Sequence, residues 1–354
     1  MKEATVTSTL TVTVKDAPIP SPQPGQLLIR VVAAGLNPKD WKLPLFFLSD
    51  APPSNQGDDI AGYVEAVGDG VVGFKKGDRV AALHQMFTPH GGYAEYAIAW
   101  AYTAFHVSDN VGFEEAATIP LAATTAALAL YQTLSLPMPW NPQATDTPTP
   151  LVIYGGSTAV GSFALKLASL SNIHPLIVIA GNGASHVETL IDRGKGDTII
   201  DYRNTDSSVL QSKIKDAANG AEIHHVFDAV AENGTYNTTA AALTAPGKIA
   251  AVWPPRAEDG AELPKGIEVE GVMVGSVHAD PPAGKTLGDR EFAAVFFAFI
   301  GRGLAGGWFS GHPVEVRQGG LNGIQKALTD LQKGKVSAVK YVVKVGETEG
   351  VQQQ

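Results

Sequence analysis

The chain of 354 residues contains no cysteine, few charged residues and no basic run. The absence of cysteine excludes disulfide bonds, thiol catalysis and thiolate-bound metal ions. Charged residues make up only 17% of the chain and the net charge is −9, so nucleic acid and anionic membrane surfaces are not expected partners. No apolar run reaches the roughly 20 residues of a membrane span, and the start lacks the apolar segment of a secretory signal. We therefore expect a cytoplasmic protein.

The first part of the chain, to about residue 120, is predicted to be rich in β-strands. Val6–Val14 alternates apolar and polar residues as a half-buried strand does. The proline-rich stretch Pro18–Gly25 cannot join a sheet interior, because proline has no amide donor. Leu27–Ala33 is a continuous apolar strand, and further strands are expected over 62–68 and 78–83. Frequent glycines between these short strands indicate a small barrel or rolled sheet.

After residue 115 the pattern changes to alternating strands and helices. Glu114–Leu134 is rich in alanine and leucine and predicts helix, and the prolines of 137–150 predict a surface loop. The alternation that follows predicts an α/β domain with a doubly wound parallel sheet. Its expected strands are 151–154, 176–180, 198–200, 225–230, 248–252 and 271–277, and its expected helices are 161–170, 185–193, 207–218 and 236–243.

The last part of the chain predicts two helices, over 290–301 and 321–333, and a final strand over 341–345. We assign these elements to the β-rich domain, with the chain crossing back to it. The predicted domains are therefore 1–125 together with 288–354, and 126–287.

A glycine-rich turn follows the first strand of the α/β domain. Its sequence runs from Tyr154 through Gly155, Gly156, Ser157, Thr158, Ala159 and Val160 to Gly161. Glycines at such a turn let backbone amides approach a pyrophosphate, and the helix N-terminus adds partial positive charge. The hydroxyls of Ser157 and Thr158 add donors. The bland alternative is a tight turn without a ligand, but the surrounding strand–helix units favour a dinucleotide site.

The end of the next strand favours NADPH over NADH. An NAD site usually places Asp or Glu there to bind the ribose hydroxyls, yet no acid appears before Glu188. Ser185 and His186 are candidate contacts of a 2′-phosphate, although the loop itself has no arginine or lysine. Tyr202, at the end of the third strand, is expected near the same ribose; alternatively, it only packs at the strand end.

Several motifs in order give the chain a family resemblance. They lie at 35–42 (GLNPKDWK), 57–64 (GDDIAGYV), 77–80 (GDRV), 91–96 (GGYAEY), 155–161 and 198–203 (TIIDYR). In these segments, from about residue 5 to 346, the chain resembles the zinc-independent medium-chain dehydrogenase/reductase superfamily. It is most similar to the quinone-reductase branch and to the fungal trans-acting enoyl reductases of polyketide pathways. The resemblance implies a GroES-like catalytic domain, a Rossmann domain and a cleft between them.

The metal ligands of the zinc enzymes in that superfamily are missing here. Their catalytic and structural zinc ions depend on cysteines, of which this chain has none. His84 and His90 could be read as metal ligands, but no third ligand stands at a suitable spacing. We expect them to be surface or cleft histidines, and we expect no metal.

The resemblance also implies the roles of individual residues. It places the loop 39–42 beside the nicotinamide, with Lys39 and Trp41 as cofactor contacts and Lys42 touching cofactor or substrate. It places Ser157–Val160 on the diphosphate. The remaining implied positions are Tyr202 at the adenosine, Ala251 and Val252 at the nicotinamide, Lys340 near the cofactor, and Gly275–His278 near the substrate or a dimer edge.

The implied reaction is hydride transfer to an acceptor that needs no Lewis acid, such as an enone, an enoyl thioester or a quinone. Asn37 and Asp40 are catalytic candidates, or they fix the loop by hydrogen bonds. No tyrosine is present over 43–50 to supply a proton. The apolar residues of 44–48 and 293–300 either line an acyl pocket or belong to the core.

Three functions remain open: an NADPH-dependent enoyl or enone reductase, an NADPH:quinone reductase, and a cofactor-binding protein with little turnover. A carrier protein that delivers the substrate is a possible partner of the first, although the acidic chain offers it no basic docking patch. The protein is expected to be a monomer or a homodimer.

Overall fold

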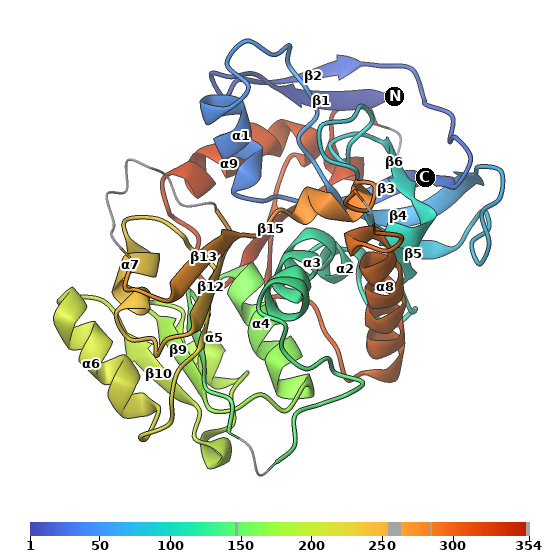
Figure 1. Ribbon diagram of the computed structural model, residues 1–354. Coiled ribbons are helices and arrows are strands. Elements are labelled where there is room, and N and C mark those ends of the chain that lie inside the picture. The colour runs from blue at the N-terminus through green and yellow to red at the C-terminus, as the bar shows by residue number, and fades with distance from the viewer. Residues whose placement is uncertain (146–147, 254–262, 284, 352–354) are drawn as a thin grey trace. The chain divides into compact units, whose positions relative to one another are not determined.

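The structure is a computed structural model that describes residues 1–145, 148–253, 263–283 and 285–351. It divides into two compact units (Figure 1). The first unit joins Met1–Leu121 to Gly275–Gln354, and the second is the continuous segment Ala122–Val274. The predicted boundary at 287/288 thus moves to 274/275. His278 lies beyond this boundary, and its Nε2 is 3.2 Å from the Thr103 hydroxyl of the first unit.

The first unit contains a hairpin and a seven-stranded sheet. The sheet order is β14-β15-β3-β4-β5-β7, with β6 also paired to β3. The strands are β1 (Lys2–Val6), β2 (Val12–Asp16), β3 (Gln26–Gly35), β4 (Asp59–Val67), β5 (Arg79–Leu83), β6 (Tyr96–Trp100), β7 (Ala104–His106), β14 (Val314–Arg317) and β15 (Lys340–Lys344). The helices are α1 (Lys39–Phe46), α2 (Phe113–Ala116), α8 (Asp289–Gly306) and α9 (Ile324–Gln332).

The long strand β3 explains how this sheet rolls. Its first half, Gln26–Arg30, pairs with β6, whereas its second half, Ala33–Gly35, pairs with β15. One irregularity in its register with β4 lies between these halves, between Val31 and Ala33, and another lies within the first half, between Leu28 and Ile29. Such bulges bend a strand and increase its twist. The predicted rolled sheet is therefore present.

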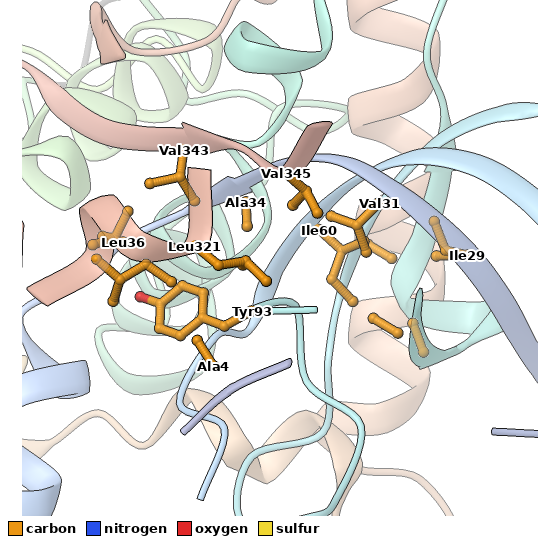
Figure 2. Packing of buried hydrophobic residues seen from close by; sticks show 14 of the residues in the cluster. Ala4, Ile29, Val31, Ala34, Leu36, Ile60, Tyr93, Leu321, Val343 and Val345 are labelled. Atoms are coloured by element: carbon orange, nitrogen blue, oxygen red, sulfur yellow. The ribbon is translucent and has the colours of Figure 1, made fainter. Parts of the chain in front are cut away.

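One apolar cluster of the first unit gathers residues from both parts of the chain that form this unit (Figure 2). Ala4, Ile60 and Tyr93 are fully buried there, and they meet Leu321 and Val343 from the C-terminal part of the chain. Burial of large apolar side chains stabilises a fold by about 1.5–3 kcal/mol each. The return of the chain to this unit is therefore part of its core and not an appendage.

The second unit is built on a six-stranded sheet in the order β10-β9-β8-β11-β12-β13. Every pairing in it is parallel. The predicted α/β fold class is thus confirmed. The strands are β8 (Leu151–Tyr154), β9 (Leu176–Ala180), β10 (Thr198–Asp201), β11 (His225–Asp228), β12 (Gly247–Ala251) and β13 (Ile267–Gly271). The helices are α4 (Ala159–Leu170), α5 (Ala184–Glu188), α6 (Ser207–Ala217) and α7 (Thr235–Ala240).

Four predicted elements differ from the structure. The segment 6–14 is no single strand: the chain turns after Val6, with Leu10 at a φ of 58°, and β1 pairs antiparallel with β2. Residues 39–46 form helix α1, not a loop. The predicted helix over 114–134 is divided into α2, α3 (Pro120–Ala127) and a π-helical segment, Leu128–Thr133. The strand expected over 271–277 ends at Gly271, and a 3₁₀ helix occupies Val274–His278.

None of the helices in the described residues is both long enough and apolar enough to cross a bilayer.

Candidate functional site

The glycine-rich turn lies in the second unit, between β8 and α4. Gly155 has a φ of 80°, which favours glycine. The amides of Gly155 and Gly156 both donate to the carbonyl oxygen of Ile179, at 2.9 and 3.2 Å. A Cβ on Gly161 would lie 2.2 Å from the carbonyl oxygen of Gly155. The missing side chains therefore let the start of α4 close tightly against the end of β8.

The first turn of α4 presents backbone amides to an anion. Thr158 is the N-cap, and its hydroxyl oxygen accepts from the amide of Gly161 at 3.0 Å. The amides of Ser157, Ala159 and Val160 make no hydrogen bond to the described residues, and all three residues are half-buried. Amides at a helix N-terminus, with the positive end of the helix dipole, bind phosphate groups. The turn fits a dinucleotide diphosphate.

Ala251 and Val252 lie at the carboxyl edge of the same sheet. Tyr154, Asp228 and Ala251 are aligned in the registers of β8, β11 and β12. The amide of Val252 donates to the carbonyl oxygen of Asp228 at 3.0 Å. The strand order reverses between β8 and β11, and parallel sheets bind ligands at the carboxyl edge beside such a reversal. The two residues are therefore brought to the edge where the glycine-rich turn begins.

Tyr202 lies next to the loop that follows β9. A Cβ on Gly181 would lie 3.0 Å from Cε1 of Tyr202, and the rings of Tyr202 and Tyr154 are 5.9 Å apart. Tyr202 nevertheless remains 42% exposed. Its ring therefore packs at the strand end and still offers a face on which an adenine could stack.

Ser185 and His186 both lie in the short helix α5. Ser185 is exposed, and Nε2 of His186 lies 3.2 Å from the hydroxyl of Ser162 in α4. Burial lowers the pKa of His186, and the charge of Lys166 adds to this effect. The His186 ring therefore favours its neutral form, which weakens it as an electrostatic partner for a phosphate.

One residue near this loop was not singled out from the sequence. Arg203 follows Tyr202, and its guanidinium NH1 donates to Oδ1 of Asn182 in the loop after β9. The parallel register of β9 and β10, which aligns Ala180 with Asp201, brings the two segments together. The signal was present in the sequence, because residues that follow neighbouring parallel strands share one edge of the sheet.

Lys39 belongs to a buried charge cluster in the first unit. Its ammonium lies 2.7 Å from Oδ1 of Asp40 and 2.6 Å from Oδ2 of Asp58, and it donates to the carbonyl oxygen of Gln56 at 2.7 Å. Burial alone would lower the pKa of Lys39, but the two carboxylates outweigh it and raise that pKa. Lys39 is thus a cation held by two carboxylates of its own unit, and its implied contact with the cofactor stays a prediction.

Asp40 is fully buried and shared by several donors. Its Oδ2 accepts from the amide of Asn37 at 2.8 Å and from the hydroxyl of Tyr93 at 2.5 Å. Burial raises the pKa of Asp40, and the Lys39 ammonium opposes that shift. Burial and the neighbouring Asp40 also raise the pKa of the Tyr93 hydroxyl. These bonds fix the start of α1, so they favour the loop-fixing alternative for Asp40.

A second buried cluster surrounds Lys340. Its ammonium donates to Asp59 and, at 3.0 Å, to Oδ1 of Asn37. The side-chain amide of Asn37 donates to Oδ2 of Asp59 at 2.7 Å, and Oδ1 of Asp59 accepts from the amide of Leu121 at 2.7 Å. Asn37, Asp59 and Lys340 are at most 3% exposed. Lys340 thus ties β15 to β4 through Asp59, and its implied place near the cofactor stays a prediction.

Lys42 and Trp41 are the members of this segment that lie nearer the surface. Both are half-buried on α1, and the Lys42 ammonium lies 5.6 Å from the centre of the Trp41 ring. The indole Nε1 of Trp41 is buried and donates no hydrogen bond within the described residues. Their implied contacts with cofactor or substrate stay predictions.

The structure buries His84, which was expected at a surface or a cleft, and also His278, which was expected near the substrate or a dimer edge. His84 is 2% exposed, and its two ring nitrogens lie 2.7 and 3.1 Å from the carbonyl oxygens of Ile98 and Thr88. His278 is 8% exposed, and burial lowers its pKa to about 4. No group of three or more metal-ligating side chains occurs among the described residues. His84 is thus a core histidine, whereas His90 is half-buried.

The apolar candidates for an acyl pocket separate into two kinds. Phe296 and Phe297 of α8 are fully buried, and the ring of Phe297 lies 6.0 Å from that of Phe105. Phe46 and Phe47 are more than half exposed at the end of α1. The residues of α8 therefore favour the core alternative.

A cavity of about 520 Å³ lies elsewhere in the first unit. Charged side chains of both signs line it, and none of the candidate residues does. Its lining includes Arg30, Glu95, Tyr96, Lys344 and Glu347.

Comparison with known proteins identifies the family. Residues 23–109 match the alcohol dehydrogenase GroES-like domain. The chain is 47% identical over 324 residues to the trans-enoyl reductase fsr4 of Gibberella fujikuroi, covering 91% of this chain and 92% of the relative. The chain belongs to the trans-enoyl reductase family. The predicted membership of the medium-chain dehydrogenase/reductase superfamily, in its enoyl reductase group, is thereby confirmed.

Two solved structures show the same fold as this trans-enoyl reductase family member. The CurK enoyl reductase matches with a TM-score of 0.75 and 19% identity, over 97% of this chain and 98% of that one. A mycobacterial protein solved in complex with NADPH matches with a TM-score of 0.71 and 20% identity, over 97% of this chain and 99% of that one.

Proposed function

We propose that this protein is an NADPH-dependent reductase of the carbon–carbon double bond in α,β-unsaturated carbonyl compounds, acting on a polyketide thioester. The observation that carries the proposal is the 47% identity, over nearly the whole chain, to a protein named a trans-enoyl reductase. The amides at the start of α4 support the nucleotide part of it. Bound NADPH would supply a hydride for the β-carbon of the substrate.

The second unit would hold the cofactor. The amides of Ser157, Ala159 and Val160 would bind the diphosphate, and the exposed ring of Tyr202 would stack on the adenine. Ala251 and Val252 would flank the nicotinamide end. These residues position the cofactor and take no part in the chemistry.

The first unit would stabilise the charge that the substrate develops. As hydride reaches the β-carbon, negative charge grows on the carbonyl oxygen, where a donor accelerates the reaction. We assign this donor role to Lys42, which lies half-buried on α1 with its ammonium 5.6 Å from the centre of the Trp41 ring. Asn37, Asp40, Lys39 and Lys340 are then positioning residues that hold α1, and the group that protonates the α-carbon is left unassigned.

The absence of cysteine supports a substrate that accepts hydride without activation by a metal ion. Without thiolates the chain cannot build the cysteine-bound zinc sites of its superfamily. An enoyl thioester is already polarised, so hydride addition to it needs positioning more than a Lewis acid. We therefore propose metal-free catalysis.

The test is the oxidation of NADPH, followed by its absorbance, with a panel of enoyl thioesters, simple enones and quinones. We expect enoyl thioesters to be reduced fastest and NADH to be used less well. The variant Lys42→Met should lower kcat by about 10- to 1,000-fold, the range for losing one donor to a developing oxyanion. Lys75→Met, which alters an exposed lysine at a turn, is the matched control and should keep full activity.

Two results would contradict the proposal. Turnover restricted to quinones would instead favour the quinone reductase, which shares this fold. Tight NADPH binding without oxidation, including with a carrier-bound enoyl substrate, would favour a cofactor-binding protein. Loss of activity in both lysine variants would show that Lys42 has no special role.

A further inference from the structure

Arg203 is held in one orientation beside the loop that follows β9. Its Nε and NH2 groups donate to both carboxylate oxygens of Asp201, at distances of 2.6 to 3.2 Å, and NH1 donates to Oδ1 of Asn182. The pair with Asp201 is about half exposed. A guanidinium clamped in this way by one carboxylate points its remaining donor edge in a fixed direction.

The acidic side chains near this loop are already engaged. Hydrogen bonds from Arg203 lower the pKa of Asp201 to about 2, and the charge of Lys213 contributes. Glu188 accepts from Nε and NH2 of Arg193 at 3.0 and 2.6 Å, and this pairing lowers the pKa of Glu188. The loop residues 181–187 themselves include no acid. No carboxylate of the loop itself is therefore present to bind a pair of ribose hydroxyls.

Asn182 shows where a hydrogen-bond acceptor can lie on the side of the Arg203 guanidinium that does not face Asp201. Its Oδ1 takes the hydrogen bond of NH1, and Asn182 itself is exposed in the loop. A phosphate oxygen is a stronger acceptor than an amide oxygen, because a hydrogen bond between two charged groups is roughly twice as strong as a neutral one. A phosphate at this position would replace the Asn182 side chain on Arg203.

We propose that Arg203 binds the 2′-phosphate of NADPH and thereby sets the preference of this enzyme for NADPH over NADH. The inference rests on the proposed function, because it names the residue that selects the cofactor at that site. Arginine beside the second strand of a Rossmann sheet accommodates a 2′-phosphate where an acid would bind the hydroxyls. Arg203 reaches this place from the third strand.

The test measures the binding of two fragments by calorimetry, without turnover. The fragment 2′,5′-ADP carries the 2′-phosphate, and 5′-AMP lacks it. We expect the wild-type protein to bind 2′,5′-ADP more tightly. Arg203→Gln should weaken 2′,5′-ADP by about 10- to 100-fold, as expected for the loss of hydrogen bonds to a charged group, and should leave 5′-AMP within about twofold. The matched control is Arg193→Gln, which removes another half-exposed arginine paired with a carboxylate and should change neither affinity.

The outcomes separate this inference from the proposed function. If Arg203→Gln keeps the wild-type preference for 2′,5′-ADP, or if the wild-type protein shows none, the role of Arg203 is overturned while the dinucleotide site stands. If the wild-type protein binds neither fragment nor NADPH, the proposed function fails as well. Arg203→Lys, which keeps the charge but loses the planar fork, should retain part of the preference for 2′,5′-ADP. Loss of binding to both fragments in every Arg203 variant would indicate a damaged fold and overturn a specific role of Arg203.

Discussion

At the scale of single residues, His278 shows how burial converts a titratable group into a pH sensor of stability. Its Nε2 lies against the Thr103 hydroxyl, which donates to the carbonyl oxygen of Leu83 at 3.0 Å. Thr103 therefore accepts from Nε2–H, and the other ring nitrogen is buried without a partner in the described chain. A proton on that nitrogen would be both desolvated and unpaired. Burial, with the charges of His84 and Arg290, accordingly lowers the pKa of His278 to about 4.

The first prediction is that His278 makes the protein less stable in mild acid. Between pH 6.5 and 4 the unfolded chain binds a proton at this residue and the folded chain does not, so stability falls as the pH falls. From pH 7.5 to pH 5 the loss attributable to His278 is about 2 kcal/mol. Urea unfolding of the wild-type protein and His278→Gln at both pH values measures it. The variant should lose less stability than the wild-type protein; equal losses would contradict the pKa shift.

Residue identities predicted the glycine-rich turn and its place between β8 and α4 better than they predicted the charge clusters. The turn from Gly155 to Gly161 is local, so the chain order alone gives its geometry. Lys340 pairs with Asp59, 281 positions away in sequence, and nothing in a sequence of lysines and aspartates says which will meet. An ammonium in such a cluster is bound by carboxylates that the fold brings to it, so the partners of Lys39 and Lys340 are known only from the structure.

At the scale of elements, the β8–α4 turn is in such close contact with β9 that no space is left for a side chain at Gly156. A Cβ on Gly156 would lie 2.1 Å from Cγ1 of Val178 and 3.5 Å from Cδ1 of Leu165. Val178 is fully buried in β9, so it has little room to move. The turn and the neighbouring strand are therefore packed as one unit.

The second prediction follows from that contact. Gly156→Ala should cost about 1–3 kcal/mol of unfolding free energy through overpacking. Val178→Ala removes the clashing methyl groups, so the double variant should be more stable than the sum of the two single costs implies, with a coupling of about 0.5–3 kcal/mol. Urea unfolding of the four proteins measures this coupling. Additive costs would mean that another contact excludes a side chain at position 156.

A helix or strand was predicted correctly where its pattern of apolar and polar residues fits only one kind of element. The apolar runs 151–154 and 176–180 are buried on both faces, and both strands occur as predicted. The alternation of 6–14 also fits a hairpin, because a turn at Leu10 leaves the alternation intact on either side. Residues 39–46 contain a proline, which disfavours a helix in isolation. Asp40 nevertheless accepts a hydrogen bond from the amide of Asn37, which stabilises the first turn of α1. This stabilisation depends on the burial of Asp40, which follows only from the fold.

At the scale of the whole molecule, the second unit is an insertion into the first. The chain leaves the first unit after Leu121 and returns at Gly275, and β15 then completes the sheet that β3 and β4 began. Each unit has its own apolar core. The contacts proposed for the adenosine and phosphate groups of the cofactor all come from the second unit, so a ligand made of these groups alone should stabilise that unit directly.

The third prediction is that 2′,5′-ADP slows hydrogen exchange in the second unit alone. A ligand at 100 times its Kd stabilises the state that binds it by about 2.7 kcal/mol, and exchange that requires opening of the bound unit slows accordingly. Mass spectrometry should show this protection in peptides from β8, α4 and β9, and not in peptides from β3 and β15. Adenosine, which lacks phosphate, is the control and should protect weakly. Equal protection of both units would mean that the units open together; protection confined to the first unit would place the nucleotide site elsewhere.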